Sequence, residues 1–433
     1  MGQAKNSRFF YGWIIVAIST LSLVISNGLS IGGLPVFYKP IQEELLALGT
    51  VTAQTKDSVT GLGAGLTFLL AGISSLIIGL FIDRIGSRRA MIAGCLVLGG
   101  GLLFYSFADR PIDIYMSHSL LGLSLGLIGV MIQTVLISHW FRRRRGLAIG
   151  IVLTGTSFGG VIIPLIATPL IAAYGWRTSM QILSLIVWIV LLPAMIFIVK
   201  ERASDLNLTY DGDILPADAK IDAANVLDGN TFAEALRSPI FWIIALCALL
   251  IFYPIFTISQ QFILYLQNNL GVSKELASAA QSTLFFSSVA GKFLFGWLCD
   301  RFPVTTVIIV CCGIMFASTV MLLGFLTPST IFVFLVPFGL GYGGTFVLIQ
   351  LLTVESFGLR DIGKILGAIT LIETLGGFLG SVITGRLASM SDGDYTSAFY
   401  GVAIAAGMAL IMTFAMKLAN AHRKSPSAHT TGL

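Results

Sequence analysis

The sequence predicts an all-α membrane protein with twelve transmembrane helices in two pseudo-symmetric six-helix bundles, and with both termini in the cytoplasm. Composition, long apolar segments and an internal repeat lead to this fold class. Of the 433 residues, 56% are hydrophobic and 11% are charged, whereas a soluble domain carries about a quarter charged residues. So little charge suits a surface that faces lipid. The 47 glycines fit as well, because small residues let membrane helices pack closely.

Twelve apolar segments are long enough to cross a bilayer, which takes about 20 helical residues. They lie near residues 11–37, 59–82, 90–108, 112–140, 146–173, 178–199, 239–267, 275–299, 304–326, 329–356, 363–389 and 397–418. The first follows a polar, basic stretch and is expected to be a retained helix rather than a cleaved signal peptide. We expect a first bundle, a cytoplasmic linker loop, a second bundle and a cytoplasmic tail at residues 1–200, 201–238, 239–418 and 419–433.

The distribution of Lys and Arg predicts the orientation. If the termini are cytoplasmic, nineteen of the 26 lie on the cytoplasmic side, as the positive-inside rule requires. Lys292 falls inside a span, and the opposite side has Lys39, Lys56, Arg110, Arg177, Lys274 and Arg386. In the linker, Thr231 and Glu234 have capping-box spacing, which predicts a short helix. Pro239 then suits the first turn of the seventh span.

An internal repeat with a constant offset of 217 residues relates the two halves. The matches are Gly79, Asp83 and Arg84 with Gly296, Asp300 and Arg301; Gly122, Gly126 and Gln133 with Gly339, Gly343 and Gln350; and Gly150, Gly159 and Gly160 with Gly367, Gly376 and Gly377. Two parallel six-helix repeats are a transporter architecture, in which the solute site lies near the midplane between halves that rock around it.

The segment from Gly79 to Arg89, Gly-Leu-Phe-Ile-Asp-Arg-Ile-Gly-Ser-Arg-Arg, resembles the major facilitator superfamily signature between helices two and three. Residues 296–301 resemble its partial second copy, and the resemblance covers essentially the whole chain. It implies a conformational latch for the outward-facing state, made by Asp83, Arg84, Arg88, Arg89, Asp300 and Arg301. The alternative is that these charges only end helices and set the topology.

Three features resemble the monocarboxylate transporter and oxalate–formate antiporter group of that superfamily. They are Tyr11-Gly12-Trp13, Arg145-Gly146-Leu147-Ala148 and a cation shortly before Gly296. The resemblance implies small organic anions as substrates, such as lactate or pyruvate with a proton, or dicarboxylates by exchange. Two positions depart from the group. Lys292 stands where the group has a carboxylate-binding arginine, and Gly32 stands where proton-coupled animal members carry a lysine, so their coupling scheme does not transfer directly.

Two charged residues lie deep within predicted spans. Lys292 is eight residues before Asp300 and Glu373 nine residues after Lys364, which places them about 12 and 14 Å into the membrane. Charge at this depth normally faces a cavity or a partner. Lys292 is our candidate anion site, and Glu373 our candidate proton-coupling residue, with the two exchanging partners during the cycle. The alternatives are a static Lys292–Glu373 ion pair, or a lysine that snorkels towards the cytoplasm.

Further substrate-binding candidates are polar residues within the spans. Tyr115 and His118 share a face of the fourth span with several glycines, which predicts either a cavity wall near the outer mouth or a groove for helix packing. A lone histidine is more often simply hydrogen-bonded. Ser288 shares a stripe with Lys292, and the remaining candidates are Asn27, Tyr342 and Gln350. Neutral polar residues of this kind also join helices to one another.

The sequence contains no phosphate-binding glycine loop, no nucleophile elbow and no metal-ligand spacing among its five cysteines. We therefore expect no enzyme activity, cofactor or metal, and transport driven by gradients. The leading hypothesis is a monomeric, proton-coupled carrier of a small organic anion, a monocarboxylate, in the bacterial inner membrane or plasma membrane, with no nucleic-acid partner. The alternatives are a dicarboxylate or formate-type exchanger, a drug exporter and, last, a non-transporting receptor.

Overall fold

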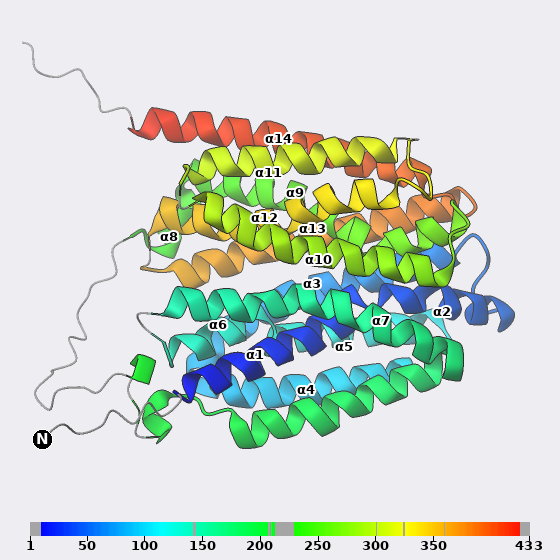
Figure 1. Ribbon diagram of the computed structural model, residues 1–433, viewed down its shortest axis with the longest axis horizontal. Coiled ribbons are helices and arrows are strands. Elements are labelled where there is room, and N and C mark those ends of the chain that lie inside the picture. The colour runs from blue at the N-terminus through cyan, green and yellow to red at the C-terminus, as the bar shows by residue number, and fades with distance from the viewer. Residues whose placement is uncertain are drawn as a thin grey trace, which may run out of the picture.

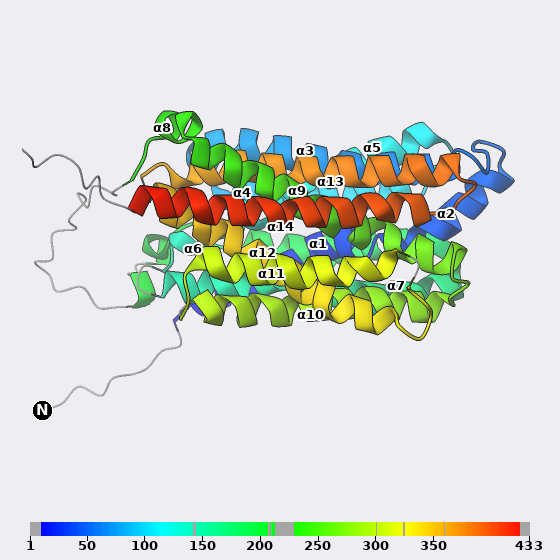
Figure 2. The ribbon, with the colours of Figure 1, turned by 90° about the horizontal axis from the view of Figure 1, so that it is seen from above.

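A computed structural model describes residues 10–141, 144–206, 208, 210–212, 229–299, 301–323, 325–358 and 360–424. This part of the chain is mostly helical, and its long helices run side by side along one axis (Figures 1 and 2). The α-helices are α1 (Gly12–Asn27), α2 (Pro35–Ala47), α3 (Lys56–Ile85), α4 (Ser87–Tyr105), α5 (Pro111–Ile128), α6 (Val130–Ser138), α7 (Arg145–Ile186), α8 (Phe232–Arg237), α9 (Pro239–Asn268), α10 (Lys274–Cys299), α11 (Val304–Thr319), α12 (Ile331–Phe357), α13 (Ile362–Met390) and α14 (Thr396–Lys424).

Eleven helical stretches of the described chain are long and apolar enough to cross a membrane, and one of them is double. The stretch Leu147–Ile198 has 52 residues, which as a straight helix would be about 78 Å long, more than twice the hydrocarbon thickness of about 30 Å. It reverses at Gly175, whose φ of 75° and ψ of 165° are not helical, and Figure 1 shows α7 turning back. Each of its two arms is long enough to cross a bilayer, which fits the twelve spans expected from the sequence.

The helices form two groups (Figure 1). Helices α1 to α7 pack against one another, as do α9 to α14, and the two groups meet where α13 packs on α3 and α10 on α7. Helix α1 begins and α14 ends at the same end of the bundle, which we call the terminal end, and the opposite end is the far end. On the charge asymmetry of the sequence, the terminal end is expected to be cytoplasmic.

The first apolar stretch, Gly12–Gly32, is followed by a second helix that the sequence does not predict. A π-helical turn, Gly28–Gly32, and two non-helical residues lead from α1 to α2, which continues to Ala47. Polar residues interrupt the apolar pattern there, yet Gln42 is buried and donates hydrogen bonds to Asp57 (3.1 Å) and Thr60 (2.9 Å). Buried polar partners thus stabilise α2, a helix that the hydropathy pattern does not indicate.

The segment between the halves is anchored at both of its described ends. The Asp211 amide donates to the Trp140 carbonyl (3.0 Å) and the Asn230 amide to the Phe357 carbonyl (2.8 Å). These two carbonyls are themselves 217 residues apart, so the segment is hydrogen-bonded to equivalent residues of the two repeats. Its short helix α8 has the predicted capping box at Thr231, and a proline opens α9. Both sequence predictions are confirmed.

Candidate functional site

The two halves meet along two seams that the repeat relates to each other. In the α7–α10 seam, a Cβ at Gly160 would lie 2.2 Å from Cγ of Phe285. In the α3–α13 seam, a Cβ at Gly377 would lie 2.9 Å from Cγ of Phe68. Both glycines and both phenylalanines are separated by 217 residues. The offset found in the sequence therefore also describes how the halves pack, with a ring against a glycine in each seam.

The α7–α10 seam is closed from the far end to the middle of the span. Near the far end, Ser278 donates to the Pro164 carbonyl (3.1 Å), and one turn later Ser282 donates to the Val161 carbonyl (2.9 Å). The seam continues through Phe285 and then Ser288, whose hydroxyl lies 3.2 Å from that of Ser157, and it reaches Lys292.

The α3–α13 seam and its surroundings are closed at the far end as well. The Ser58 and Ser389 hydroxyls lie 2.7 Å apart, and the Tyr395 hydroxyl donates to the fully buried Asp57 (2.9 Å). A third link joins Tyr38 of α2 to Gln260 of α9, at 2.7 Å. In this conformation the contacts between the halves bar passage from the far end.

Lys292 lies in the α7–α10 seam, and its residue surface is 8% exposed. Its ammonium donates across the seam to the Leu153 carbonyl (3.1 Å) and the Thr156 hydroxyl (2.6 Å), and it lies 5.1 Å from the Phe346 ring centroid. Among the described residues it takes part in no ion pair. Among the described residues, the ammonium of this buried lysine thus has only neutral hydrogen-bond partners.

Glu373 belongs to the other seam. It is partly exposed on α13, where Thr370 hydrogen-bonds with its carboxyl group and Gly72 of α3 lies against the adjacent Thr374. Glu373 and Thr156 are equivalent positions of the repeat. The alternative of a static Lys292–Glu373 ion pair is therefore wrong for this conformation. The sequence does not predict which of the two seams each helix enters.

Three other predicted residues lie on the helices around Lys292. Ser288 is fully buried one turn away, and a Cβ at Gly343 would lie 1.9 Å from its carbonyl oxygen, so α12 packs tightly on α10 here. Tyr342 places its ring 5.8 Å from that of Phe285. Gln350 is partly exposed on α12, one helical turn beyond Phe346. The structure thus gathers part of the predicted binding set on α10 and α12.

The fourth-span candidates lie elsewhere. The ring of His118 is fully buried in the first half, with Nδ1 2.8 Å from the Thr67 hydroxyl and Nε2 3.1 Å from the Tyr105 hydroxyl. A Cβ at Gly122 would lie 2.4 Å from the Thr67 carbonyl, so this face is a packing groove against α3. The cavity-wall interpretation of His118 is corrected accordingly. Tyr115 is half-buried on the same helix.

Asn27 is the remaining candidate, at the end of α1. Its side-chain nitrogen is buried and has no hydrogen-bond partner in the described part of the chain. A buried donor without an acceptor costs free energy unless a ligand or water satisfies it. Asn27 therefore stays a candidate binding residue, next to the π-helical turn that follows α1.

The predicted latch is only partly within the described structure, because Asp300 and the Asp83 side chain lie outside it. Arg84 and Arg89 are exposed. Arg88 donates to the carbonyls of Met195 (3.4 Å) and Ile196, and the Arg301 guanidinium lies 4.1 Å from the Trp297 ring centroid. Arg88 and Arg301 thus each contact their own half of the molecule.

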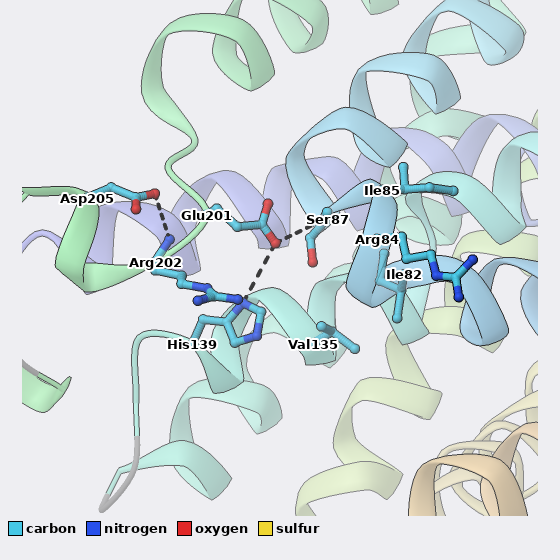
Figure 3. A pocket seen from close by; sticks show the side chains of 10 residues that line it. Ile82, Arg84, Ile85, Ser87, Val135, His139, Glu201, Arg202 and Asp205 are labelled. Atoms are coloured by element: carbon cyan, nitrogen blue, oxygen red, sulfur yellow. Dashed lines mark hydrogen bonds and ion pairs between the residues drawn. The ribbon is translucent and has the colours of Figure 1, made fainter. Parts of the chain in front are cut away.

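The carboxylate that holds the start of α4 is not among the residues that the sequence predicts. Glu201 accepts hydrogen bonds from the Ser87 and Arg88 amides, both at 2.8 Å, and lies 3.7 Å from Nδ1 of His139 (Figure 3). Anions stabilise helix N-termini, where backbone N–H groups lack partners. A cavity of about 480 Å³ adjoins it at the terminal end of the first half, away from Lys292. An acidic residue directly after the sixth span was the available signal.

Long apolar helices in two halves related by a repeat, with a buried lysine between them, are typical of a membrane transporter. The sequence profile of the Major Facilitator Superfamily matches residues 16–381, with a second match over 259–432. The chain belongs to this superfamily, whose members are transporters rather than enzymes.

Named relatives are similar over most of the chain. The "MFS transporter asaE" of Aspergillus flavus is 28% identical, covering 78% of this chain and 73% of the relative. "Monocarboxylate transporter 12" of Rattus norvegicus is 24% identical, covering 92% and 84%. "Membrane sensor protein UhpC" of Salmonella typhimurium is 25% identical, covering 89% and 88%. A solved bacterial homolog of the human lysosomal transporter Spinster has a TM-score of 0.72 at 15% identity, covering 98% of this chain and 100% of that chain, and shares the fold.

Proposed function

We propose that this transporter carries small organic anions and binds their carboxylate at Lys292. The observation that carries the proposal is the buried ammonium in the α7–α10 seam, whose partners in the described part of the chain are all neutral. Charge inside a membrane is costly and normally marks a transport pathway. A carboxylate accepts stronger hydrogen bonds from an ammonium than a neutral oxygen does, so the substrate would supply the missing counter-charge.

A monocarboxylate fits this site better than a dicarboxylate does. Lys292 is the one lysine or arginine that the sequence places at midspan, so one carboxylate can be matched and a second would stay unpaired in an apolar surrounding. The similarity to a protein named monocarboxylate transporter 12 supports this choice. The site would be reached from the terminal end, on the cytoplasmic side of a bacterial inner membrane or plasma membrane.

Proton coupling would use Glu373. Because Glu373 and Lys292 lie in different seams, the proton and the anion would be linked through the movement of the halves rather than by direct exchange of partners. Each ligand would favour one arrangement of the halves, and that is sufficient for coupling.

Counterflow in proteoliposomes tests the proposal. Radiolabelled lactate, pyruvate, formate, oxalate and succinate are compared with and without a pH gradient. Lys292→Gln is expected to lower flux of the transported anion about thirtyfold or more, since losing one member of a buried charge pair costs about 2–5 kcal/mol. Lys292→Arg should retain flux, and Lys274→Gln, at an exposed lysine of the same helix, is the control. Anion flux through Lys292→Gln above half that of the unaltered protein would refute the anion site.

The similarity to a membrane sensor protein supports a second candidate, a non-transporting receptor. It predicts anion binding that depends on Lys292 without counterflow of any anion. A drug exporter predicts instead robust efflux of neutral or cationic hydrophobic compounds that Lys292→Gln leaves unchanged. The same proteoliposomes distinguish the three functions.

A further inference from the structure

We propose that Thr156 is a positioning residue that restrains the empty transporter, because it holds Lys292 across the α7–α10 seam until a substrate anion takes its place. The inference rests on the proposed function, in which a carboxylate binds Lys292. Its consequence is a carrier that exchanges one anion for another faster than it returns empty.

The restraint is made of one side chain from the second half and two acceptors from the first. The Thr156 hydroxyl donates to the Leu153 carbonyl (2.9 Å), so its lone pairs are free to accept from the ammonium at 2.6 Å. The same carbonyl also accepts from the ammonium. Lys292 is therefore held by a closed set of three hydrogen bonds, two of which cross between the halves.

This contact is the strongest of the described links along its seam. The links nearer the far end join neutral groups, namely serine hydroxyls with carbonyls and a ring with a glycine. A hydrogen bond from a charged donor is roughly twice as strong as a neutral one. Opening the far end in the empty state would break it and leave the ammonium without acceptors. The equivalent pair in the other seam, Ser75 and Glu373, forms no described hydrogen bond, so the restraint is one-sided.

A bound carboxylate removes the restraint. The ammonium gains a charged acceptor that moves with the second half, and the first half is no longer needed to satisfy it. The loaded carrier can then separate α10 from α7, whereas the empty carrier cannot do so without losing the bond. Binding energy at Lys292 thereby lowers the barrier to opening, and this links substrate occupancy to movement.

A distance measurement tests the restraint without any substrate. Spin labels at Gln54→Cys and Ser391→Cys, both exposed at the far end, report the separation of the halves in a Cys299→Ser background, where the other four cysteines are buried. We call the conformation in which the halves are apart at the far end far-open, and the present one far-closed. In anion-free buffer, Thr156→Val should enlarge the far-open population about tenfold, which corresponds to the lower part of the energy range for a hydrogen bond to a charged group. Thr156→Ser should restore the original distribution. The matched control is Thr154→Val, whose hydroxyl donates within α7 to the Ile151 carbonyl. Identical distributions for Thr156→Val and Thr154→Val would overturn the inference.

A flux measurement tests the consequence. With radiolabelled lactate, the ratio of exchange to net efflux should fall about tenfold in Thr156→Val, through faster net efflux, for the same loss of a charge-assisted bond. An unchanged ratio, or a parallel loss of both rates, would contradict it. An enlarged far-open population without lactate flux would support the restraint and count against the proposed cargo, so the two claims can fail separately.

Discussion

The ring-against-glycine packing predicts how a single methyl group redistributes the conformations of this transporter. Gly160→Ala would place a Cβ 2.2 to 2.5 Å from three ring atoms of Phe285, where carbon contacts normally measure about 3.5–4.0 Å. The ring is 1% exposed and cannot turn away into solvent. The far-closed state must therefore separate at this point or strain.

The expected size follows from overpacking, which costs about 1–3 kcal/mol in a well-packed core. Since about 1.4 kcal/mol corresponds to a factor of ten, the population of the far-closed state should fall relative to the far-open state by about fivefold to 150-fold. The far-open state does not have this strain, because α7 and α10 are separated at this contact. Gly377→Ala, the repeat-equivalent change in the α3–α13 seam, would place a Cβ 2.9 Å from Cγ of Phe68 across the seam and should act in the same direction. It would also meet Phe256 of its own half.

The chain supplies matched controls for both changes. A Cβ at Gly150 on α7 or at Gly367 on α13 would meet nothing within 4 Å, and these two positions are also related by the 217-residue offset. The assay is the spin-label distance distribution between residues 54 and 391. Equal distributions for Gly160→Ala and Gly150→Ala would show that the packing does not hold the far end closed, and the reasoning would fail.

Two further predictions concern the terminal end. Glu201→Gln weakens the cap on α4 and should lower the free energy of unfolding by about 0.5–2 kcal/mol, which is measured as a lower Tm. The control, Glu355→Gln at an exposed site, should leave Tm unchanged. Equal Tm values for the two variants would contradict the capping role. A hydrogen bond from the Phe232 amide, then one from Lys364, lowers the pKa of Asp361 below its usual 3.8. This carboxylate therefore helps to hold α8 above about pH 4, and the contribution is lost as pH falls through the lowered pKa. Hydrogen-exchange protection of α8 should decline there in the unaltered protein and be weak at every pH in Asp361→Asn; protection in Asp361→Asn that equals that of the unaltered protein would refute it.

Hydropathy and the internal repeat predicted the approximate lengths of the spans and the correspondence between the two halves. Span lengths follow from the thickness of the hydrocarbon layer, and the offset of the repeat fixes which residues are equivalent, down to paired glycines in the two seams. The depths of Lys292 and Glu373 in the membrane stay predictions from the constant rise per residue of a helix.

Periodicity did not predict which neighbour each helix face meets. The face of α5 that carries His118 looked equally suited to a cavity or to packing, and only the position of Thr67 on α3 decides between them. Likewise, the partners of Lys292 come from α7, which precedes it by well over a hundred residues. Helix α2 was not predicted, because Gln42 has buried polar partners that a hydropathy pattern cannot detect.

The hairpin at Gly175 couples movement of α7 at the α7–α10 seam to the sixth span on the outer side of the protein. With φ at 75° and ψ at 165°, this residue has a backbone conformation that is essentially confined to glycine, and the helices on either side follow without an intervening loop. The fifth and sixth spans are thus joined by a single residue and should move together as one rigid body. Phe197 is 73% exposed near the end of the sixth span that lies away from Gly175. A fluorophore at this position should therefore report the movement of the halves from outside the substrate path.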